Sequence, residues 1–395
     1  MKFIRKSLTN KALFLFTILV FSGVILGIAF NRLQIKSASL NLILVVLAII
    51  LLTVLLLFIF DVVIPVGRVT RQITNLLTGK NYKRIEPITI DEVGVITHFF
   101  NEITRDLEKI SYDVRERRRM SSELDIASQI QKDVLPKEVP EAPALDIVAK
   151  TRTASEVGGD TFNFIPSADN NQLFIYIGDV TGHGVPAGLI MMMVDTLVNA
   201  IISRGVTNGR ELVIYTNKLL TPRINARLFM TSVVLRWDKL HQKMYYTGAG
   251  HEHILIYHTK TEKVDAIRSG GIALGMIPDV SQIAQEQEIP LEIGDTIVLY
   301  SDGITEAKNK TGEMYGLERL AESVRKNGYK PSSESVFDGV TKEFANFVGE
   351  YVQIDDITMI VIRYRGNEAA ASKAKLTISK EGVQQERKSV IWDWE

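Results

Sequence analysis

The stretch Ile177-Gly178-Asp179-Val180-Thr181-Gly182-His183-Gly184 decides the fold prediction for this chain. It follows the apolar run Leu173–Ile177, which predicts a buried strand, and it leads into the helical run Val185–Ile202. Pro186 suits the first turn of that helix. Glycine lets the backbone approach a small ligand closely, and an aspartate at a strand end suits a hard cation or a phosphate-bearing substrate. A plain loop is the alternative, because motifs of this kind also occur without a function.

Further aspartates also lie beside predicted strand ends. Asp160 follows Gly158-Gly159, Asp302 follows an apolar run, and the doublet Asp355-Asp356 precedes another. Several aspartates with water around a hard cation are the ligand chemistry of Mg²⁺ or Mn²⁺. Two such ions that share a carboxylate can activate a water for in-line attack on a phosphoryl group. For each aspartate alone, a turn or strand cap is the alternative role.

Length and composition narrow the possible functions. With 395 residues, two or more domains are expected. Lys+Arg and Asp+Glu both number 46, so nothing indicates nucleic acid as a partner. The chain contains no cysteine, which excludes disulfides, thiolate zinc sites and a cysteine nucleophile.

Two apolar runs near the N-terminus, Ala12–Phe30 and Leu40–Phe60, are each long enough to span a bilayer as a helix. A signal peptide is the alternative for the first run, but no small-residue cleavage pattern follows it. The segment Asn31–Ser39 then forms a short hairpin loop. Basic residues before the first run and after the second predict a multi-pass protein of the cytoplasmic membrane with both ends in the cytoplasm.

After the second apolar run, two segments carry apolar residues at the coiled-coil period, which requires a partner helix. Their apolar positions are Val62, Val66, Val69, Ile73 and Leu76, and then Ile96, Phe100, Ile103, Leu107, Ile110 and Val114. With the connector Lys80–Ile90, Pro65 and the Asp91-Glu92-Val93-Gly94 box, the region Asp61–Val114 resembles a HAMP signalling module. The resemblance implies a parallel homodimer. An amphipathic helical hairpin packed on the following domain is the alternative.

The coiled-coil pattern stops at the charged run Arg115–Arg119. Past it, Leu124, Ala127, Ile130 and Val134 predict a fresh helical face that ends at Pro136. This helix is either a switch element or an inert spacer, and the sequence leaves both open.

From Leu145 onward the pattern is that of an α+β domain, in which two sheets are flanked by helices. Strands are expected at Leu145–Lys150, Gln172–Ile177, Thr231–Trp237, Lys243–Thr247, Ile254–His258, Thr296–Tyr300 and Thr358–Tyr364, and helices at Val185–Ile202, Glu211–Leu220, Leu317–Lys326 and Ser335–Val348. The polar tail 366–395 is expected to be largely disordered, with Val390–Trp394 as a small apolar docking patch or a loose terminus.

The region Leu124–Arg365 resembles the bacterial type 2C (PPM) metal-dependent serine/threonine phosphatases, in the branch typified by stage II sporulation protein E. Beyond the aspartate segments, the matching motifs are Thr247-Gly248-Ala249-Gly250-His251, Ile272-Ala273-Leu274-Gly275 and Gly312-Glu313-Met314-Tyr315-Gly316. The resemblance implies an αββα sandwich with two Mn²⁺ or Mg²⁺ ions between the sheets. It implies as ligands Asp160, Asp179, Asp302 and Asp355, with a backbone carbonyl at Gly178 or Val180 as a weaker candidate; Asp356 is the lesser candidate of its doublet.

Some positions depart from that branch or have two possible roles. The branch usually has an aromatic residue and an aspartate where this chain has Thr161 and Asn163, so a third or outer metal contact is expected to be weakened. His183 is either a general acid for the leaving oxygen or a turn residue. Arg152 either binds the substrate phosphate or lies on the surface of a strand. His251 is expected to be structural.

The sequence thus predicts a membrane-anchored, dimeric, signal-regulated protein serine/threonine phosphatase. Its expected substrate is phosphoserine or phosphothreonine on a small regulatory protein, such as an anti-sigma-factor antagonist. The alternatives are a metal-poor pseudophosphatase that holds a partner and a membrane relay that acts by oligomerisation. The expected parts are a membrane hairpin (1–60), a HAMP-like module (61–114), a linker or switch helix (115–143), the phosphatase domain (144–365) and the tail (366–395).

Overall fold

The structure is a computed structural model that describes residues 7–32, 37–86, 91–140, 142, 144–225, 227–350, 353–366 and 375–378. The chain divides into two compact units, Met1–Arg119 and Met120–Glu395.

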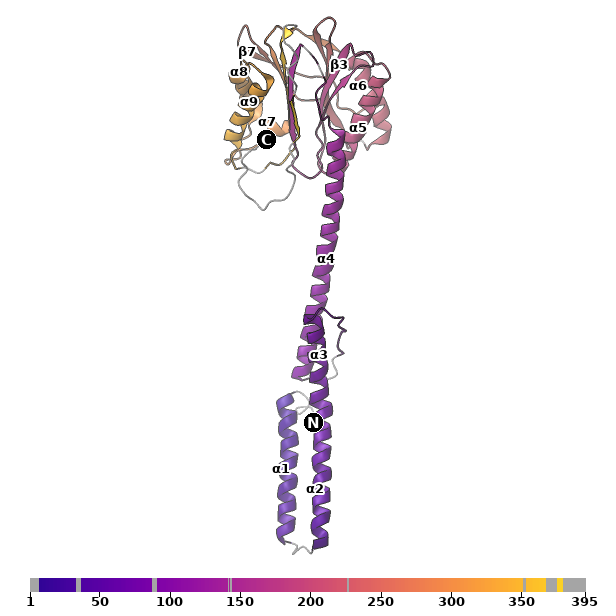
Figure 1. The fold of residues 1–395 in the computed structure, drawn as a ribbon, viewed down its shortest axis with the longest axis vertical. Helices are drawn as coiled ribbons and strands as arrows, with labels where there is room; N and C mark the ends of the chain where they lie inside the picture. The colour runs from indigo at the N-terminus through magenta and orange to yellow at the C-terminus, as the bar shows by residue number, and fades with distance from the viewer. Residues whose placement is uncertain are drawn as a thin grey trace. The chain divides into compact units, whose positions relative to one another are not determined.

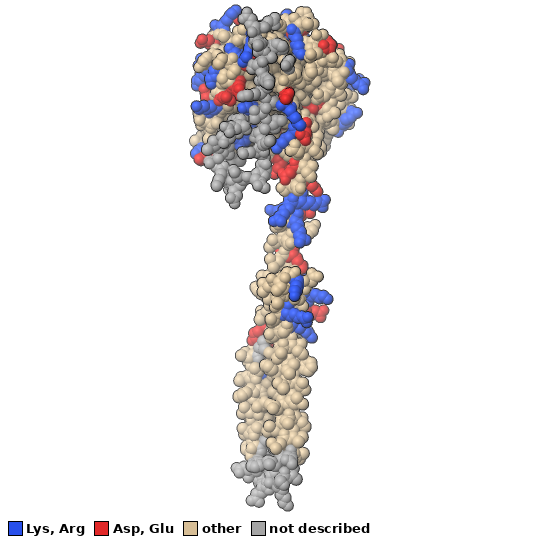
Figure 2. Space-filling model, in the orientation of Figure 1, with Lys and Arg blue, Asp and Glu red and all other residues tan. Residues whose placement is uncertain are grey.

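The N-terminal unit begins with two helices that lie side by side, α1 (Leu8–Arg32) and α2 (Ser37–Phe58) (Figure 1). A π-helical turn, η2 (Ile59–Val63), connects α2 to α3 (Ile64–Leu77). Figure 2 shows a surface almost free of charged side chains along α1 and α2. Among the described residues, Leu44–Leu77 is long and apolar enough to cross a membrane, and Thr9–Ile25 is a shorter apolar helix. The membrane hairpin therefore stays a prediction.

The base of α1 is joined to the start of α4 (Glu92–Val134) by a buried ion pair. Lys11 Nζ lies 2.6 Å from Asp91 Oδ2, and both residues are buried. Asp91 Oδ1 also accepts hydrogen bonds from the backbone N–H groups of Val93 and Gly94, both at 3.2 Å. Asp91 thus caps α4 and holds the first helix at the same time.

The charged run Arg115–Arg119 lies within one continuous helix. The coiled-coil pattern was expected to stop at this run and a fresh helical face to follow it, and α4 carries both parts as a single helix over Glu92–Val134. Arginine and glutamate are good helix formers, so the backbone continues although the apolar face changes.

The C-terminal unit contains two mostly antiparallel sheets with helices on their outer faces (Figure 1). One sheet has the order β11 (Lys375–Ile378), β1 (Leu145–Arg152), β10 (Ile357–Tyr364), β9 (Thr296–Tyr300), β6 (Ile254–His258), β7 (Lys263–Ile267); the other has the order β2 (Thr161–Pro166), β3 (Gln172–Val180), β4 (Met230–Asp238), β5 (Lys243–Ala249), β8 (Gln287–Ile289). We call them sheet A and sheet B. The expected α+β architecture with two sheets is confirmed.

Four helices cover the two sheets from outside. Sheet B is covered by α5 (Val185–Ser203) and α6 (Gly209–Leu220), and sheet A by α8 (Gly316–Asn327) and α9 (Ser333–Val348). Helix α5 is also long and apolar enough to be a membrane candidate, but half of it is buried within the domain, as expected of a core helix. The layers therefore run helix, sheet, sheet, helix.

The strands alternate between two apolar layers, as the two-residue period of a strand requires. In β3, Leu173, Ile175 and Ile177 belong to the core between the sheets. Phe174 and Tyr176 face the other way and pack beneath α5. Because both faces of the strand are buried, its sequence is almost continuously apolar, which explains why it was easy to predict.

Four strands were not expected from the sequence: β2, β7, β8 and β11. β7 is a polar, largely exposed edge strand, so its sequence carries little hydrophobic signal. β11 lies in the tail that was expected to be disordered and pairs in parallel with β1 through Val148 and Lys375. The apolar patch Val390–Trp394 lies outside the described residues.

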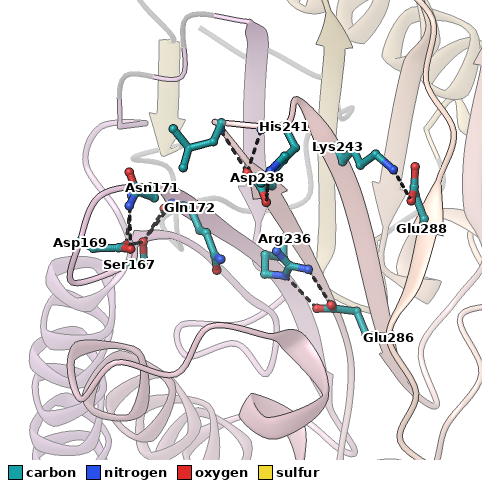
Figure 3. A network of polar contacts seen from close by, with 11 residues as sticks. Ser167, Asp169, Asn171, Gln172, Arg236, Asp238, His241, Lys243, Glu286 and Glu288 are labelled. Atoms are coloured by element: carbon teal, nitrogen blue, oxygen red, sulfur yellow. Dashed lines mark hydrogen bonds and ion pairs between the residues drawn. The ribbon is translucent and has the colours of Figure 1, made fainter.

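A polar network on sheet B fixes the start of α6 (Figure 3). Arg236 of β4 makes two hydrogen bonds to the carboxylate of Glu286, at 2.9 and 2.6 Å. Glu286 Oε1 also accepts from the backbone N–H of Gly209, the first residue of α6, at 2.6 Å. Arg236 lies 4.2 Å from the centre of the Tyr245 ring. The network joins α6, β4 and β5 through one arginine.

Candidate metal centre

Two of the predicted ligands lie at facing positions on sheet B. In the antiparallel pair of β2 and β3, Thr161 is opposite Gly178, so Asp160 and Asp179 face each other one step further along. Asp160 is 3% exposed, and Asp179 is half-buried. The turn that follows β3 needs Gly182 and Gly184 at φ 87° and 76°, conformations that favour glycine. The stretch Ile177–Gly184 thus turns sharply beside the carboxylates of Asp160 and Asp179.

The other two predicted ligands come from adjacent strands of sheet A. Met359 of β10 is opposite Tyr300 of β9. Asp302 follows β9 and begins the short helix α7 (Asp302–Thr305), whereas Asp355 precedes β10 by two residues. Because β9 and β10 are antiparallel, the end of one and the start of the other lie at the same edge of the sheet.

The two pairs meet across the sandwich through Thr358. Its hydroxyl Oγ1 donates to Asp160 Oδ2 at 2.6 Å, a direct contact between sheet A and the start of β2. Thr358 is fully buried, and its Oγ1 also lies 2.8 Å from the hydroxyl of Thr151 on β1. This contact joins the Asp160 segment to β10 of sheet A, and a metal centre built from all four aspartates stays a prediction.

The carboxylates destabilise one another's charged forms. Burial, followed by the charges of the other aspartates, raises the pKa of Asp179 to about 9. The pKa of Asp302 rises to about 6 for the same reasons, with Asp355 as the largest neighbouring charge. The pKa of Asp160 lies well above its ordinary value because of burial and the charge of Asp356.

These electrostatics fit a divalent cation. The largest neighbouring charges that shift the pKa of Asp160, Asp179 and Asp302 belong to carboxylates. Hard oxygen donors with no basic partner are the set that Mg²⁺ and Mn²⁺ prefer. Within the part of the chain that the structure describes, no three acidic or histidine side chains already surround one common ion position.

Asp356 has a different place from Asp355. Its carboxylate accepts backbone hydrogen bonds from Ala154 at 2.7 Å, Gly159 at 2.7 Å and Asp160 at 3.3 Å. It is buried, while Asp355 is exposed. Asp356 thus shapes the loop that carries Asp160, which agrees with its lower rank as a ligand.

Asn163 does not face the aspartates. Phe162 and Phe164, its neighbours on β2, belong to the core between the sheets, so Asn163 lies on the opposite face, beneath α5. Its amide donates to the buried carboxylate of Asp195 at 2.8 Å. The expectation that Asn163 weakens a metal contact finds no support in this geometry.

The remaining candidates have different surroundings. His183 is exposed between two glycines, and no hydrogen bond of its ring is found among the described residues. Arg152 is the last residue of β1 and lies opposite Ile357. The carbonyl oxygen of Val180 lies close to Gly159, where a Cβ would come within 2.9 Å of it. The catalytic and ligand roles of these residues stay predictions.

His251 lies in the connection from β5 to β6, which passes from sheet B to sheet A, and not at a strand start. Its Nδ1 lies 2.9 Å from Thr231 Oγ1, next to Asp179 in the β3–β4 pair. Burial lowers the pKa of His251 to about 4, so the ring is neutral at physiological pH. This supports the expected structural role.

Residues that the sequence did not single out also support the centre. Thr358 joins the sheets, and Ser301 Oγ accepts from the backbone N–H of Thr358 at 3.0 Å. Gln131 on α4 contacts the backbone of Gly158. Their roles depend on contacts between distant segments, and a single threonine, serine or glutamine carries no local signal for that.

Comparison with known proteins agrees with this geometry. Residues 169–365 match the family model described as stage II sporulation protein E (SpoIIE). Phosphoserine phosphatase RsbU of Bacillus subtilis is 29% identical over 246 residues, which cover 62% of this chain and 70% of RsbU. The chain spans only 46% and 45% of two further curated relatives.

Solved structures show the same fold. The SiaA-PP2C domain of Pseudomonas aeruginosa has a TM-score of 0.53 at 24% identity and covers 63% of this chain and 98% of that domain. The RsbU and RsbW domains of Rv1364c from Mycobacterium tuberculosis have a TM-score of 0.51 at 23% identity, covering 59% of this chain and 63% of that one. The expectation of a phosphatase domain of the type 2C fold is confirmed by these matches.

Proposed function

We propose that this chain, whose C-terminal part carries a phosphatase domain of the stage II sporulation protein E kind, is a metal-dependent protein serine/threonine phosphatase. The observation that supports the proposal is electrostatic: the charges of Asp160, Asp302 and Asp355 all raise the pKa of Asp179, although these residues come from both sheets. The similarity to a phosphoserine phosphatase supports phosphoserine as the substrate group. A small regulatory protein, such as an anti-sigma-factor antagonist, is the proposed bearer of that group.

In this proposal Asp160, Asp179, Asp302 and Asp355 hold two Mn²⁺ or Mg²⁺ ions, with the carbonyl of Val180 as a weaker donor. Bound ions of this kind supply a water of lowered pKa and neutralise charge on a phosphoryl group. Thr358 orients the carboxylate of Asp160 through its 2.6 Å hydrogen bond. Arg152 is proposed to bind the substrate phosphate, and His183 to protonate the leaving oxygen.

The N-terminal unit is proposed to anchor the enzyme in the cytoplasmic membrane and to regulate it as a parallel homodimer. Two observations support this. The helix pair α1 and α2 is apolar on its outside, and Ile96, Ile103 and Leu107 of α4 are exposed at the coiled-coil period. In this arrangement both termini lie in the cytoplasm, and residues 61–114 act as a HAMP-like module.

The test is release of phosphate from a phosphoserine protein by the purified full chain, with and without Mn²⁺. Asp179→Asn and Asp302→Asn are each expected to lower the Mn²⁺-dependent rate by about 100-fold or more. The control is Asp169→Asn, an exposed loop residue whose carboxylate only pairs with its neighbours in a turn. Equal rates in wild type and both centre variants would remove the proposed site.

A pseudophosphatase that holds a phosphorylated partner is the alternative. It predicts that the chain binds a phosphorylated partner with or without metal and releases no phosphate. The same assay therefore separates the two.

A further inference from the structure

A small cavity lies at the edge of sheet A where β9 ends and β10 begins. Its volume is about 120 Å³, and its lining includes Asp355, a predicted metal ligand, and Gly303, the residue that follows Asp302. We call it the Asp355 cavity. Because these two lining residues belong to or adjoin the aspartate centre, a molecule bound at that centre lies within reach of the cavity.

The lining of the Asp355 cavity is largely apolar. Its apolar members are Ala307, Met314, Val348, Ile354 and Ile357. Met314 is 51% exposed and Ile354 is 69% exposed, so two large apolar side chains face solvent close to a predicted metal ligand. A partner that covers them removes apolar surface from water, which favours binding. Binding sites typically combine an apolar lining of this kind with a few polar groups.

One wall of the cavity is fixed by Gln353. Its side-chain Nε2 donates to the backbone carbonyl oxygen of Arg152 at 2.9 Å and to that of Asp355 at 2.8 Å. The first bond ties the segment to the end of β1, and the second folds the segment back on itself. Ile354 stands between Gln353 and Asp355 in the chain, so its backbone is held from both sides.

A second wall of the cavity is a short hairpin. The backbone N–H of Tyr315 donates to the carbonyl oxygen of Ala307 at 2.8 Å, and Lys308 and Met314 form an antiparallel bridge. Asn309 Oδ1 accepts two backbone N–H groups within the turn, both at 3.0 Å. Met314 is thus presented by a closed turn. Because both walls are held by hydrogen bonds, little ordering is left to occur when a ligand binds.

The size and charge of the cavity select the kind of occupant. A cavity of about 150 Å³ holds one benzene molecule, whereas sites for drug-sized ligands span about 300–1,000 Å³. The Asp355 cavity, at about 120 Å³, therefore suits one side chain of moderate size. Glu306 and Asp355 line it together with Lys308, so an acidic side chain would meet two carboxylates and one ammonium. A neutral aliphatic side chain avoids this repulsion and covers Met314 and Ile354.

We propose that the Asp355 cavity is a specificity subsite that binds an aliphatic side chain within about three residues of the phosphoserine in the substrate protein. An extended chain advances by about 3.3 Å per residue, and Asp355 belongs to both the cavity and the predicted metal centre, which sets this short spacing. Ile354 and Met314 are then the residues that determine the preference. The inference rests on the proposed function in requiring that the phosphoserine bind at the aspartate centre.

The test uses the full chain in detergent with Mn²⁺ and a set of phosphoserine peptides. The reference peptide has alanine at the three positions on each side of the phosphoserine, and every other peptide carries one leucine or one glutamate at one of these positions. Phosphate release gives kcat/KM, and fluorescence anisotropy of labelled peptides gives Kd.

Two variants change the lining, and one serves as the control. Ile354→Ser and Met314→Ser each shorten an exposed lining residue, so their effect on folding is small. Ile293→Ser is the matched control, because Ile293 is also 69% exposed but precedes β9, at the opposite end of that strand from Asp302.

Leucine at one position is expected to raise kcat/KM about tenfold over the alanine peptide. Ile354→Ser and Met314→Ser are each expected to lower this ratio to about threefold or less, and Ile293→Ser to leave it within about twofold of wild type. Equal values for all peptides in wild type, or the wild-type leucine preference in both lining variants, would overturn the inference. A glutamate preference would also overturn it, as would a leucine preference that appears only after deletion of residues 379–395, since the tail would then be the occupant.

The Kd values separate this inference from the proposed function. Tighter binding of a leucine peptide, lost in Ile354→Ser and without phosphate release, supports the inference and refutes the phosphatase. Phosphate release at the same rate from all peptides supports the phosphatase and refutes the inference. A chain that neither binds nor hydrolyses any of the peptides refutes both.

Discussion

At the scale of single residues, the buried aspartates of the centre raise the free energy of the charged, metal-free site. A bound cation offsets this unfavourable term. Asp179 and Asp302 have raised pKa values, about 9 and about 6, because each is buried near other carboxylates. In the folded, metal-free protein both groups hold protons that the unfolded chain would release above its ordinary aspartate pKa. The pH dependence of stability follows from this difference.

The stability of the metal-free protein is expected to fall as pH rises from about 5 to about 9. Over this range the unfolded chain binds fewer protons than the folded one, so the free energy of unfolding decreases with pH. The melting temperature measured by calorimetry in chelator is expected to drop by roughly 5 °C or more. Asp179→Asn is expected to abolish the decrease in melting temperature above the pKa of Asp302. Saturating Mn²⁺ is expected to abolish most of the decrease that is left below it. A melting temperature that rises with pH across the range would contradict the assignment.

Asn163 and Asp195 are expected to behave as an interdependent pair beneath α5. Asp195 also accepts from Tyr176 Oη at 2.6 Å and from the Asn199 amide at 3.0 Å. Asn163→Asp places a second carboxylate against Asp195, so we expect a loss of about 2 kcal/mol in urea unfolding, with Mn²⁺ affinity unchanged.

The control for this pair is the double variant Asn163→Asp/Asp195→Asn, which exchanges the acid and the amide across the same contact. It is expected to recover most of the lost stability. A change in the number of bound Mn²⁺ ions in Asn163→Asp would show that this position does reach the metal centre.

The residue scale also shows what sequence could and could not predict. The strand-end positions of Asp179, Asp302 and Asp355 were predictable because each stands where an apolar run begins or ends, whereas Asp160 was singled out by the preceding Gly158-Gly159. Gln131, Thr358 and the loop-holding role of Asp356 were not, because their partners lie far away in the chain. The sequence could not show which way Asn163 points, because strand β2 was not predicted. Phe162 and Phe164 face the core between the sheets, and Asn163 therefore lies on the opposite face.

At the scale of elements, the buried pair Arg236–Glu286 is expected to matter far more than the exposed pair next to it. Glu286→Ala leaves a mostly buried guanidinium without its partner and frees the start of α6, so we expect a loss of about 3 kcal/mol. Glu288→Ala breaks only the Lys243 pair, whose side chains are 48% and 42% exposed, and should cost less than about 1 kcal/mol. Both pairs appear in Figure 3, and urea unfolding followed by circular dichroism measures both changes. Equal losses would contradict the burial argument.

Elements with a strong pattern were the predictable ones. The central strands β3, β9 and β10 and the helices α5 and α9 carry long apolar signals, and their predicted bounds agree with the structure to within a few residues. β7 and β8 are short or polar edge strands that depend on a neighbour for their hydrogen bonds. For α4 the sequence predicted a change of apolar face at the charged run, and the structure shows that the helix continues through it.

At the scale of the whole molecule, the proposed parallel dimer can be tested by disulfide cross-linking. The chain has no cysteine, so a single introduced thiol has no competitor. Ile103→Cys lies on the apolar row of α4, 42% exposed, and is expected to cross-link most of the chain into a dimer under mild oxidation in membranes.

Asp106→Cys is the control, because it is exposed on α4 but lies outside that apolar row. It is expected to cross-link at least about tenfold more slowly, since a thiol that points away from the seam cannot reach disulfide distance. Similar rates at the two positions, read from non-reducing gels, would argue against a parallel pairing in this register.

At the scale of the whole molecule, the order of a membrane hairpin, a HAMP-like module and a phosphatase domain stays a prediction. Apolar runs, the coiled-coil period and the aspartate segments each identified a part of the chain. Membrane insertion, pairing of copies and choice of substrate depend on other molecules, and one folded chain carries only the surfaces for them.

The buried ion pair between Lys11 and Asp91 makes the conformation of the N-terminal unit depend on the position of the first helix. A buried carboxylate deprived of its ammonium costs several kcal/mol. That amount is similar to the gap that typically separates two alternative conformations of a protein. A displacement of the N-terminal end of the first helix away from Asp91 would thus change the free energy enough to shift this unit from one conformation to another, without a ligand binding to it.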